Sequence, residues 1–252
     1  MSFSFDGLFW FLLTLLALLT LQRVLHREIQ AVFLILTRNP ALTMGLFSIL
    51  FFPGVFLHEL SHFLMARLLG VRTGGFSLIP RAMPNGNLQL GYVETAQTDL
   101  ARDALIGAAP IISGGLVVSY IALSKIDLLP LWDVLRNANF GLFWLGISML
   151  PQVKDFPLWF YLTFVVSSTM MPSESDRHAW LPLGLLIAFL IVLALFAGAG
   201  PWMLENVTPW LNSFLRAVAL IFGLSALVHA VIIPPAFLLH RALARLSGVD
   251  IA

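Results

Sequence analysis

Long apolar stretches separated by short polar ones dominate the chain. A membrane-spanning helix needs about 20 mostly apolar residues, and the pattern predicts about six such helices. We expect them at residues 8–21 (extended by Phe3 and Phe5), 41–69, 104–123, 156–171, 181–199 and 214–239. The last is expected to bend at Pro234 and Pro235, and the sequence Asn39-Pro40 separates the first from the second.

Two further segments are apolar but do not fit a span. Residues 22–38 mix charged and apolar positions, which is typical of an interfacial amphipathic helix or of a polar end on a long first helix. Residues 140–150 are too short to cross a bilayer, so we expect a re-entrant or interfacial segment there.

Between the second and third predicted spans, the pattern changes to one typical of strands. Residues 74–79 and 88–93 flank the turn sequence Pro84-Asn85-Gly86, which predicts a short β-hairpin. The predicted fold is therefore an all-α polytopic membrane protein with a short membrane-associated β-hairpin after the second helix. We expect a single membrane-embedded domain over residues 1–252, with a core at about 41–180 and extra helices at 1–38 and 181–245.

Composition supports a chain that faces lipid. Hydrophobic residues make up 59% of the chain and charged residues 11%, whereas soluble domains carry about a quarter charged residues. The net charge of +1 gives no electrostatic footprint for nucleic acid, and the lack of cysteine excludes disulfides and thiolate chemistry. The first apolar run lacks a preceding basic region, so it reads as a retained span. Arg241 and Arg245 follow the last span, which predicts a cytoplasmic C-terminus.

The second predicted span contains the sequence His58-Glu59-Leu60-Ser61-His62. Residues four apart lie on one face of a helix, so His58 and His62 can direct both imidazoles at one ion. Glu59 lies close enough to act as a general base on water, which is the arrangement of zinc hydrolases. Chance matches to this pattern number on the order of 0.003 for a chain of this composition.

The apolar surroundings of the motif strengthen the metal hypothesis. A charged side chain in the middle of a membrane costs about 2.5–3.5 kcal/mol on insertion scales, and a divalent cation bound by the histidines would offset that cost. The alternative is that these side chains only hydrogen-bond to other helices. Zinc needs a third protein ligand, and the best candidates follow the fourth predicted span: Asp176 first, then Glu174, then His178.

These features together resemble the site-2 protease family of intramembrane metalloproteases. The resemblance covers roughly residues 47–176. It implies one Zn²⁺ bound by His58, His62 and Asp176, with Glu59 as the base and a membrane-protein or membrane-peptide substrate. Thr169, Ser175 and Arg177 stand where the family has Asn, Leu and Gly, and the family's PDZ insert is missing.

The hairpin and one further histidine complete the candidate functional residues. An unpaired strand edge could bind an extended substrate by strand addition, with Gly75, Phe76, Leu90 and Tyr92 as the candidate contacts; the alternative is a loop lying on the membrane surface. His229 lies mid-way along the last predicted span, where a hydrogen bond to another helix is the favoured role.

The predicted function is hydrolysis of peptide bonds in or near transmembrane segments by a multi-pass membrane protein, with the active site nearer the cytoplasmic face. Two other classes stay open: a catalytically inactive zinc-binding scaffold, and a transporter using the same polar residues. The lack of a detectable inverted repeat argues against the transporter. A haem protein with histidine ligands is a more distant alternative.

Overall fold

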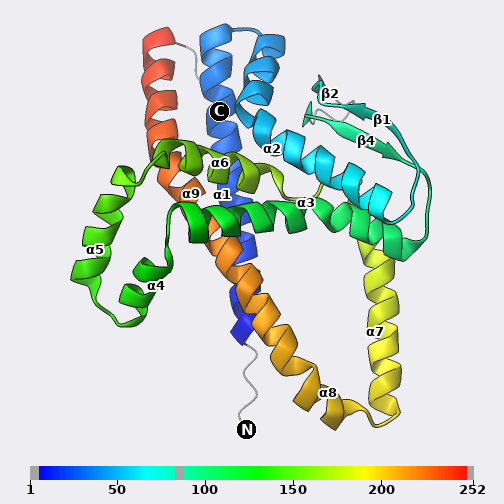
Figure 1. Cartoon of the computed structure of the whole chain (residues 1–252). Helices are drawn as coiled ribbons and strands as arrows, with labels where there is room; N and C mark the ends of the chain where they lie inside the picture. The colour runs from blue at the N-terminus through cyan, green and yellow to red at the C-terminus, as the bar shows by residue number, and fades with distance from the viewer. Residues whose placement is uncertain (1–5, 83–87, 249–252) are drawn as a thin grey trace.

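A computed structural model describes residues 6–82 and 88–248 of the chain. Helices make up most of it, with two small two-stranded sheets between the second and third long helices (Figure 1). The helices are α1 (Asp6–Thr37), α2 (Pro40–Leu68), α3 (Leu100–Tyr120), α4 (Leu129–Arg136), α5 (Phe140–Met149), α6 (Phe156–Thr169), α7 (Trp180–Phe196), α8 (Gly200–Asn206) and α9 (Thr208–Ser247). A π-helical turn, Ile121–Lys125, extends α3, and a 3₁₀ turn, Leu150–Gln152, follows α5.

The number of spans is lower than the sequence predicted. Within the described residues, four helices are long and apolar enough to cross a membrane: α1, α2, α3 with its π-helical turn, and α9. Counting α7 and α8 as one broken span, bent by 117°, raises the number to five. The prediction of six is therefore wrong. α6 has 14 residues, which at 1.5 Å each rise about 21 Å against an apolar layer of about 30 Å.

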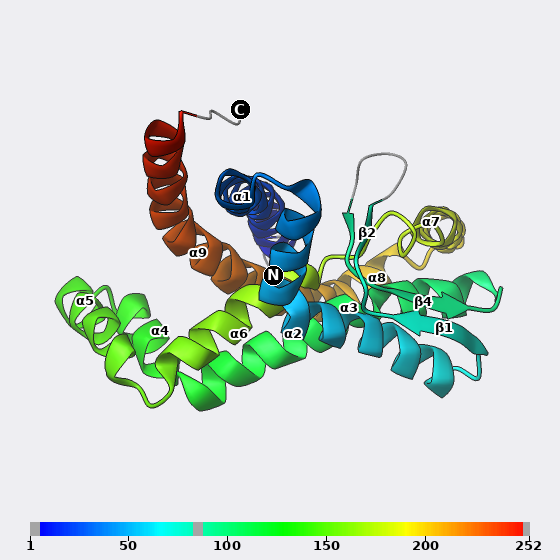
Figure 2. The ribbon, with the colours of Figure 1, turned by 90° about the horizontal axis from the view of Figure 1, so that it is seen from above.

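The first helix settles the alternatives for residues 22–38. α1 runs without a break to Thr37, so this segment is the polar end of a long first helix. Glu28 and Leu25 are buried there because α9 lies alongside α1 over much of its length (Figures 1 and 2). Asn39 caps α2 by accepting hydrogen bonds from the amides of Ala41 and Leu42, and the prediction for α2 is confirmed to within one residue at each end.

The α1–α9 pair crosses a second group made of α2, α3 and α6 (Figures 1 and 2). α2 packs against both α3 and α6, and it carries Pro53 in its interior, which explains the bend that Figure 1 shows along α2. The main apolar core lies where the two groups cross and includes Leu25 of α1, Phe51 of α2 and Val165 of α6.

The predicted hairpin is present, but each of its strands is interrupted. β1 (Thr73–Ser77) pairs antiparallel with β4 (Tyr92–Thr95), and β2 (Arg81–Ala82) pairs with β3 (Leu88–Gln89). Pro80, which has no amide hydrogen to donate, lies in the gap between β1 and β2. The predicted turn at Pro84-Asn85-Gly86 lies outside the described residues.

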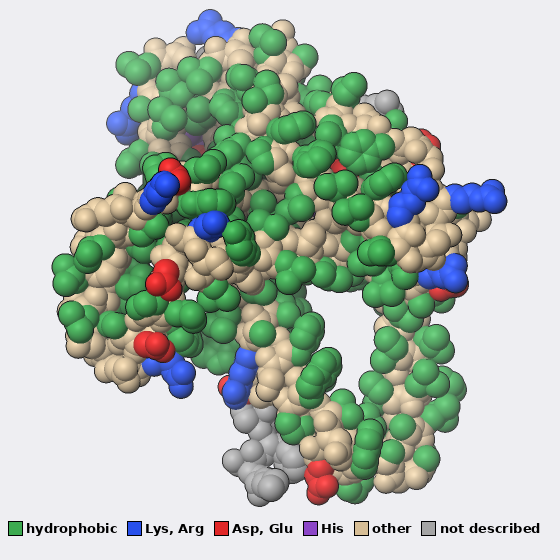
Figure 3. Space-filling model, in the orientation of Figure 1, with side chains coloured by type: hydrophobic (Ala, Val, Ile, Leu, Met, Phe, Trp, Pro, Cys, Tyr) green, Lys and Arg blue, Asp and Glu red, His purple; other side chains and the backbone are tan. Residues whose placement is uncertain are grey.

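Hydrophobic side chains cover most of the surface in Figure 3, and charged ones form a few separate groups. α7 is the extreme case: none of its residues, all of which are described, is buried. It contacts α3 near its start and stands away from the lower part of α9 (Figures 1 and 3). Such a surface is compatible with an integral membrane protein.

Candidate metal centre

The site is built on the middle of α2, which carries His58, Glu59 and His62. Glu59 and His62 are buried and His58 is half-buried, because α3 covers one side of α2 and α6 the other. The close approach of α6 depends on Gly54: a Cβ at this position would lie 2.3 Å from the carbonyl oxygen of Val165. The backbone of α6 therefore reaches the histidine face of α2.

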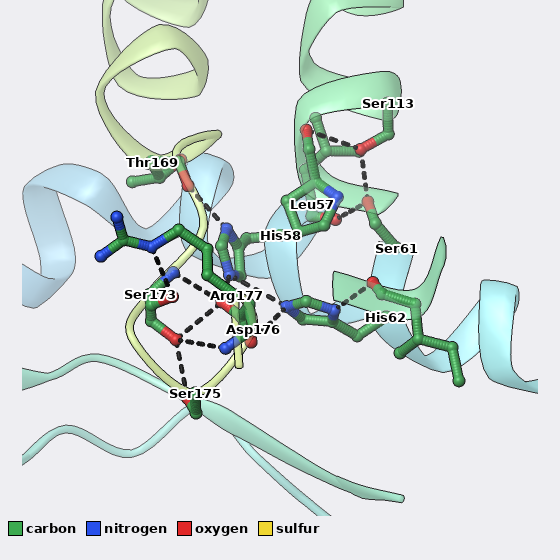
Figure 4. A network of polar contacts seen from close by, with 12 residues as sticks. Leu57, His58, Ser61, His62, Ser113, Thr169, Ser173, Ser175, Asp176 and Arg177 are labelled. Carbon is green, nitrogen blue, oxygen red and sulfur yellow. Dashed lines mark hydrogen bonds and ion pairs between the residues drawn. The ribbon is translucent and has the colours of Figure 1, made fainter. Parts of the chain in front are cut away.

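Both histidines are oriented through their Nδ1 atoms. His58 Nδ1 lies 2.6 Å from the carbonyl oxygen of Thr169 at the end of α6, and His62 Nδ1 lies 2.8 Å from that of Ile106 in α3 (Figure 4). A carbonyl only accepts, so each Nδ1 carries a hydrogen, and Nε2 is the nitrogen left to act as a ligand. The two Nε2 atoms point toward each other and lie 3.1 Å apart.

Asp176 completes this group from the segment between α6 and α7. Its carboxylate oxygens lie 3.4 Å from His62 Nε2 and 3.6 Å from His58 Nε2. Burial by itself raises the pKa of the Asp176 carboxyl, but its contacts with His58, His62 and Ser173 outweigh burial and hold that pKa below its usual range. Asp176 is therefore a carboxylate whose oxygens face the Nε2 atoms of the two imidazoles.

The loop that carries Asp176 is fixed at two points. The amide and the hydroxyl of Ser173 both donate to Asp176 Oδ2, at 2.7 Å each. The loop backbone also lies directly against α3 at Gly107, where a Cβ would come within 1.9 Å of the carbonyl oxygen of Asp176. A side chain at position 107 would push the carboxylate away from the histidines.

The three side chains fit the geometry of a tetrahedral cation. Zinc bonds of about 2.0–2.1 Å to nitrogen and oxygen give separations of roughly 3.3 Å between neighbouring ligand atoms. Here the two Nε2 atoms are 3.1 Å apart, and they lie 3.4 and 3.6 Å from different oxygens of the Asp176 carboxylate; one ligand atom from each residue lies within 4.8 Å of the others. Lone pairs and negative charge that converge in this way repel one another unless a proton or a cation lies between them. The donor set thus suits a divalent metal ion with one open position.

Glu59 lies beside this group, against the hairpin. A Cβ at Gly91 would lie 2.8 Å from Glu59 Cγ and 3.0 Å from Glu59 Oε1, so the backbone between β3 and β4 touches the Glu59 side chain. Of the candidate substrate contacts, Leu90 packs against the main core, and Phe76 is 43% exposed and lies beside the ring of Phe63.

The other two candidates from the hairpin lie in β1 and β4. The amide of Gly75 donates to Glu94 Oε2 at 3.0 Å, and Tyr92 is half-buried opposite Ser77.

Among the described residues, His58, His62 and Asp176 form the one group of three His, Cys, Asp or Glu side chains whose ligand atoms could share an ion. Glu174 is exposed and outside this group. His178 lies outside it as well, since its Nε2 contacts Asp103 Oδ2 at 2.6 Å and its Nδ1 donates to the carbonyl oxygen of Ser175.

Sequence reasoning missed the residues that support the centre: Ser173, Gly91 and the carbonyls of Thr169 and Ile106. The spacing of Ser173 and Asp176 gave a signal, since Ser followed three residues later by an acidic residue is typical of local capping hydrogen bonds.

Comparisons with protein families, with characterised proteins and with solved structures find no match to this chain.

Proposed function

We propose that the protein is a multi-pass intramembrane zinc metalloprotease, related to the site-2 protease family, that hydrolyses peptide bonds in or near transmembrane segments. The observation that carries the proposal is the convergence of His58 Nε2, His62 Nε2 and the Asp176 carboxylate beside Glu59, on a helix long and apolar enough to cross a membrane. Placing such polar atoms in an apolar layer costs free energy. A bound metal ion would offset that cost.

Each residue has a defined role in this mechanism. His58, His62 and Asp176 would hold one Zn²⁺, which supplies a Lewis acid for a peptide carbonyl and lowers the pKa of water. The Glu59 carboxylate accepts a proton from the attacking water and delivers it to the leaving amide nitrogen. The carbonyls of Thr169 and Ile106 hold both imidazoles in one orientation, with Nε2 directed toward the ion.

The substrate class follows from the position of the site and from the family resemblance. A peptide bond must leave helical conformation before its carbonyl can be attacked, and β1 and β4 lie close to Glu59 through Gly91. We propose that an extended substrate segment binds along this hairpin near Phe76, Leu90 and Tyr92. With the C-terminal end cytoplasmic and the four spans α1, α2, α3 and α9, α2 ends on the cytoplasmic side, so we propose that the active site is nearer that face.

Hydrolysis and metal content together test the proposal. The purified full-length protein should contain about one zinc per chain and should cleave a reporter peptide with a transmembrane segment in detergent or liposomes. Glu59→Gln should keep the zinc and lose at least about 100-fold in cleavage, the lower range for a general base. Glu174→Ala and His178→Ala serve as controls that should keep both.

Three results would point elsewhere. A zinc-loaded wild type that cleaves no reporter would favour a membrane zinc-binding scaffold. Metal or proton flux in liposomes without cleavage would favour a transporter. Full cleavage by Glu59→Gln would remove the base assigned here.

A further inference from the structure

The last turn of α6 meets helices α1 and α2 through its backbone. Carbonyl groups in the last turn of a helix have no partner inside that helix. The carbonyl of Thr169 accepts from His58 Nδ1 of α2, and that of Ser168 accepts from Gln22 Nε2 of α1, both at 2.6 Å. Two neighbouring carbonyls are thus bound by two different helices, one of which carries the candidate metal centre.

The side chain of Ser168 is bound by a third helix. Its hydroxyl lies 2.9 Å from His229 Nε2 of α9, and His229 Nδ1 lies 2.7 Å from the carbonyl oxygen of Ser225. Because Nδ1 donates to a carbonyl, Nε2 accepts and the Ser168 hydroxyl donates. Ser168 and His229 are 2% and 0% exposed, so water does not compete for this bond. The expected hydrogen bond of His229 across helices is confirmed.

We propose that Gln22 and His229 are positioning residues for the metal centre, acting through Ser168. The inference rests on the proposed function. The Ser168 carbonyl lies in one plane with the amide and the Cα of Thr169, so holding the Ser168 carbonyl and hydroxyl fixes the position of the residue whose own carbonyl meets His58. The α1–α9 pair supplies no candidate ligand itself, but it thereby sets the orientation of the candidate ligand His58.

The contacts of α6 with α1 and α9 also fix the position at which the loop that carries Asp176 begins. Met170 follows Thr169 directly, is 2% exposed, and packs between Leu18 of α1 and Phe222 of α9. On its other side it touches α3, where a Cβ at Gly114 would lie 2.5 Å from Met170 Cβ. The positions of His58 and Asp176 therefore both depend on where α1 and α9 hold the end of α6.

Packing of the helices against one another does not by itself account for this polar cluster. Two of its buried atoms, Gln22 Oε1 and Ser225 Oγ, have no hydrogen-bond partner among the described residues. An unpaired buried polar atom costs free energy, and apolar side chains of similar shape would join the helices without that cost. The polar groups are explained if their contacts with Ser168 are needed for the site.

The test uses full-length protein in detergent, loaded with Co²⁺ in place of zinc. Chelator competition gives the affinity for Co²⁺, and the visible spectrum of Co²⁺ reports the geometry of its ligands. Ser168→Ala, Gln22→Leu and His229→Ala should each weaken Co²⁺ binding about 10- to 100-fold, as is typical when a group behind a ligand is lost, and should change the spectrum. His229→Gln, whose amide oxygen can accept from Ser168, should restore most of the affinity.

Two matched controls separate positioning from general loosening of the helices. Gln30→Leu makes the same exchange as Gln22→Leu at an exposed position of α1. His240→Gln breaks a different buried contact between α1 and α9, the one with Glu28. Both should keep wild-type affinity and spectrum. Equal loss in His240→Gln would overturn the proposal, because the effect would then not pass through Ser168.

Wild-type affinity and spectrum in Ser168→Ala, Gln22→Leu and His229→Ala would also overturn it. Should the two larger changes prevent folding, Ser168→Ala decides alone, since it removes only one hydroxyl from a helix. A wild-type protein that binds neither Co²⁺ nor zinc would overturn the metal centre itself, and this inference with it. That outcome differs from a loaded wild type with unaffected variants, which leaves the centre in place.

Discussion

In the part of the chain that the structure describes, histidine and carboxylate side chains meet at two buried places, and the atoms that meet are different. At the candidate metal centre, two Nε2 atoms face each other at 3.1 Å, and a carboxylate lies 3.4–3.6 Å from them. Between α1 and α9, His240 Nδ1 lies 2.6 Å from Glu28 Oε2. The second arrangement is a direct hydrogen bond between one donor and one acceptor, with no room for an ion.

The difference arises from what occupies Nδ1. In the metal centre, backbone carbonyls bind Nδ1 of His58 and His62, so both Nε2 lone pairs are left to converge with Asp176. At the other place, the carboxylate of Glu28 binds Nδ1 itself, and Arg27 approaches its second oxygen at 3.4 Å. A histidine beside a carboxylate is therefore a candidate ligand only when another group fixes its far nitrogen.

The largest expected difference between the two places is in how their variants change the zinc content of the protein. Asp176→Ala should lower zinc from about one per chain to background, because two imidazoles alone leave the ion with too few protein ligands. Glu28→Ala should leave the zinc content unchanged. Elemental analysis of the two purified variants checks this. Zinc retained by Asp176→Ala would move the third ligand to Glu174 or His178.

The free energy of unfolding should show the opposite order, with the larger loss in Glu28→Ala. Glu28→Ala removes one partner of a buried pair and leaves His240 uncompensated, so we expect a loss of about 3 kcal/mol in the free energy of unfolding. In apo protein, Asp176→Ala should cost less, since the Asp176 side chain is 16% exposed against 4% for that of Glu28. Denaturant titration in detergent micelles compares the two. An equal loss in both variants would contradict the distinction.

A substitution in α3 tests how the loop holds the third ligand. Gly107→Ala places a Cβ against the carbonyl of Asp176 and should weaken zinc binding about 100-fold, the upper range for displacement of a supporting group. Gly184→Ala on α7 is the matched control, because nothing lies within 4 Å of a Cβ there. Zinc affinity by chelator competition gives the comparison, and unchanged affinity in Gly107→Ala would show that the loop does not need this contact.

The smallest expected effect concerns Ser173. Ser173→Ala removes the hydroxyl that donates to Asp176 Oδ2 but keeps the amide that donates to the same oxygen. Zinc affinity should fall about 10-fold, the lower range for such a group. Ser175→Ala should change it little, since Ser175 reaches the site only through the hydroxyl of Ser173. The reverse order of the two variants would assign the supporting role to Ser175.

The sequence by itself determined the parts of this protein that depend on local periodicity. A helical repeat of 3.6 residues places His58 and His62 on one face whatever surrounds them. Asn39, Pro40 and Gly70 delimit α2 through capping and backbone preferences that act within a few residues. The change from helical to alternating pattern likewise predicted a hairpin after α2, because side-chain direction in a strand is also local.

Only the tertiary structure decided which distant segments meet. The sequence ranked Asp176 ahead of Glu174 and His178, but only the contact of the loop with Gly107 and the hydrogen bonds of Ser173 place the Asp176 carboxylate beside the two histidines. The number of spans was overestimated because α6, with 14 residues, is shorter than a span, and because α7 passes only together with α8, from which it is bent by 117°. The link from Gln22 and His229 to His58 joins four helices through single hydrogen bonds, and no local pattern in the sequence encodes such contacts.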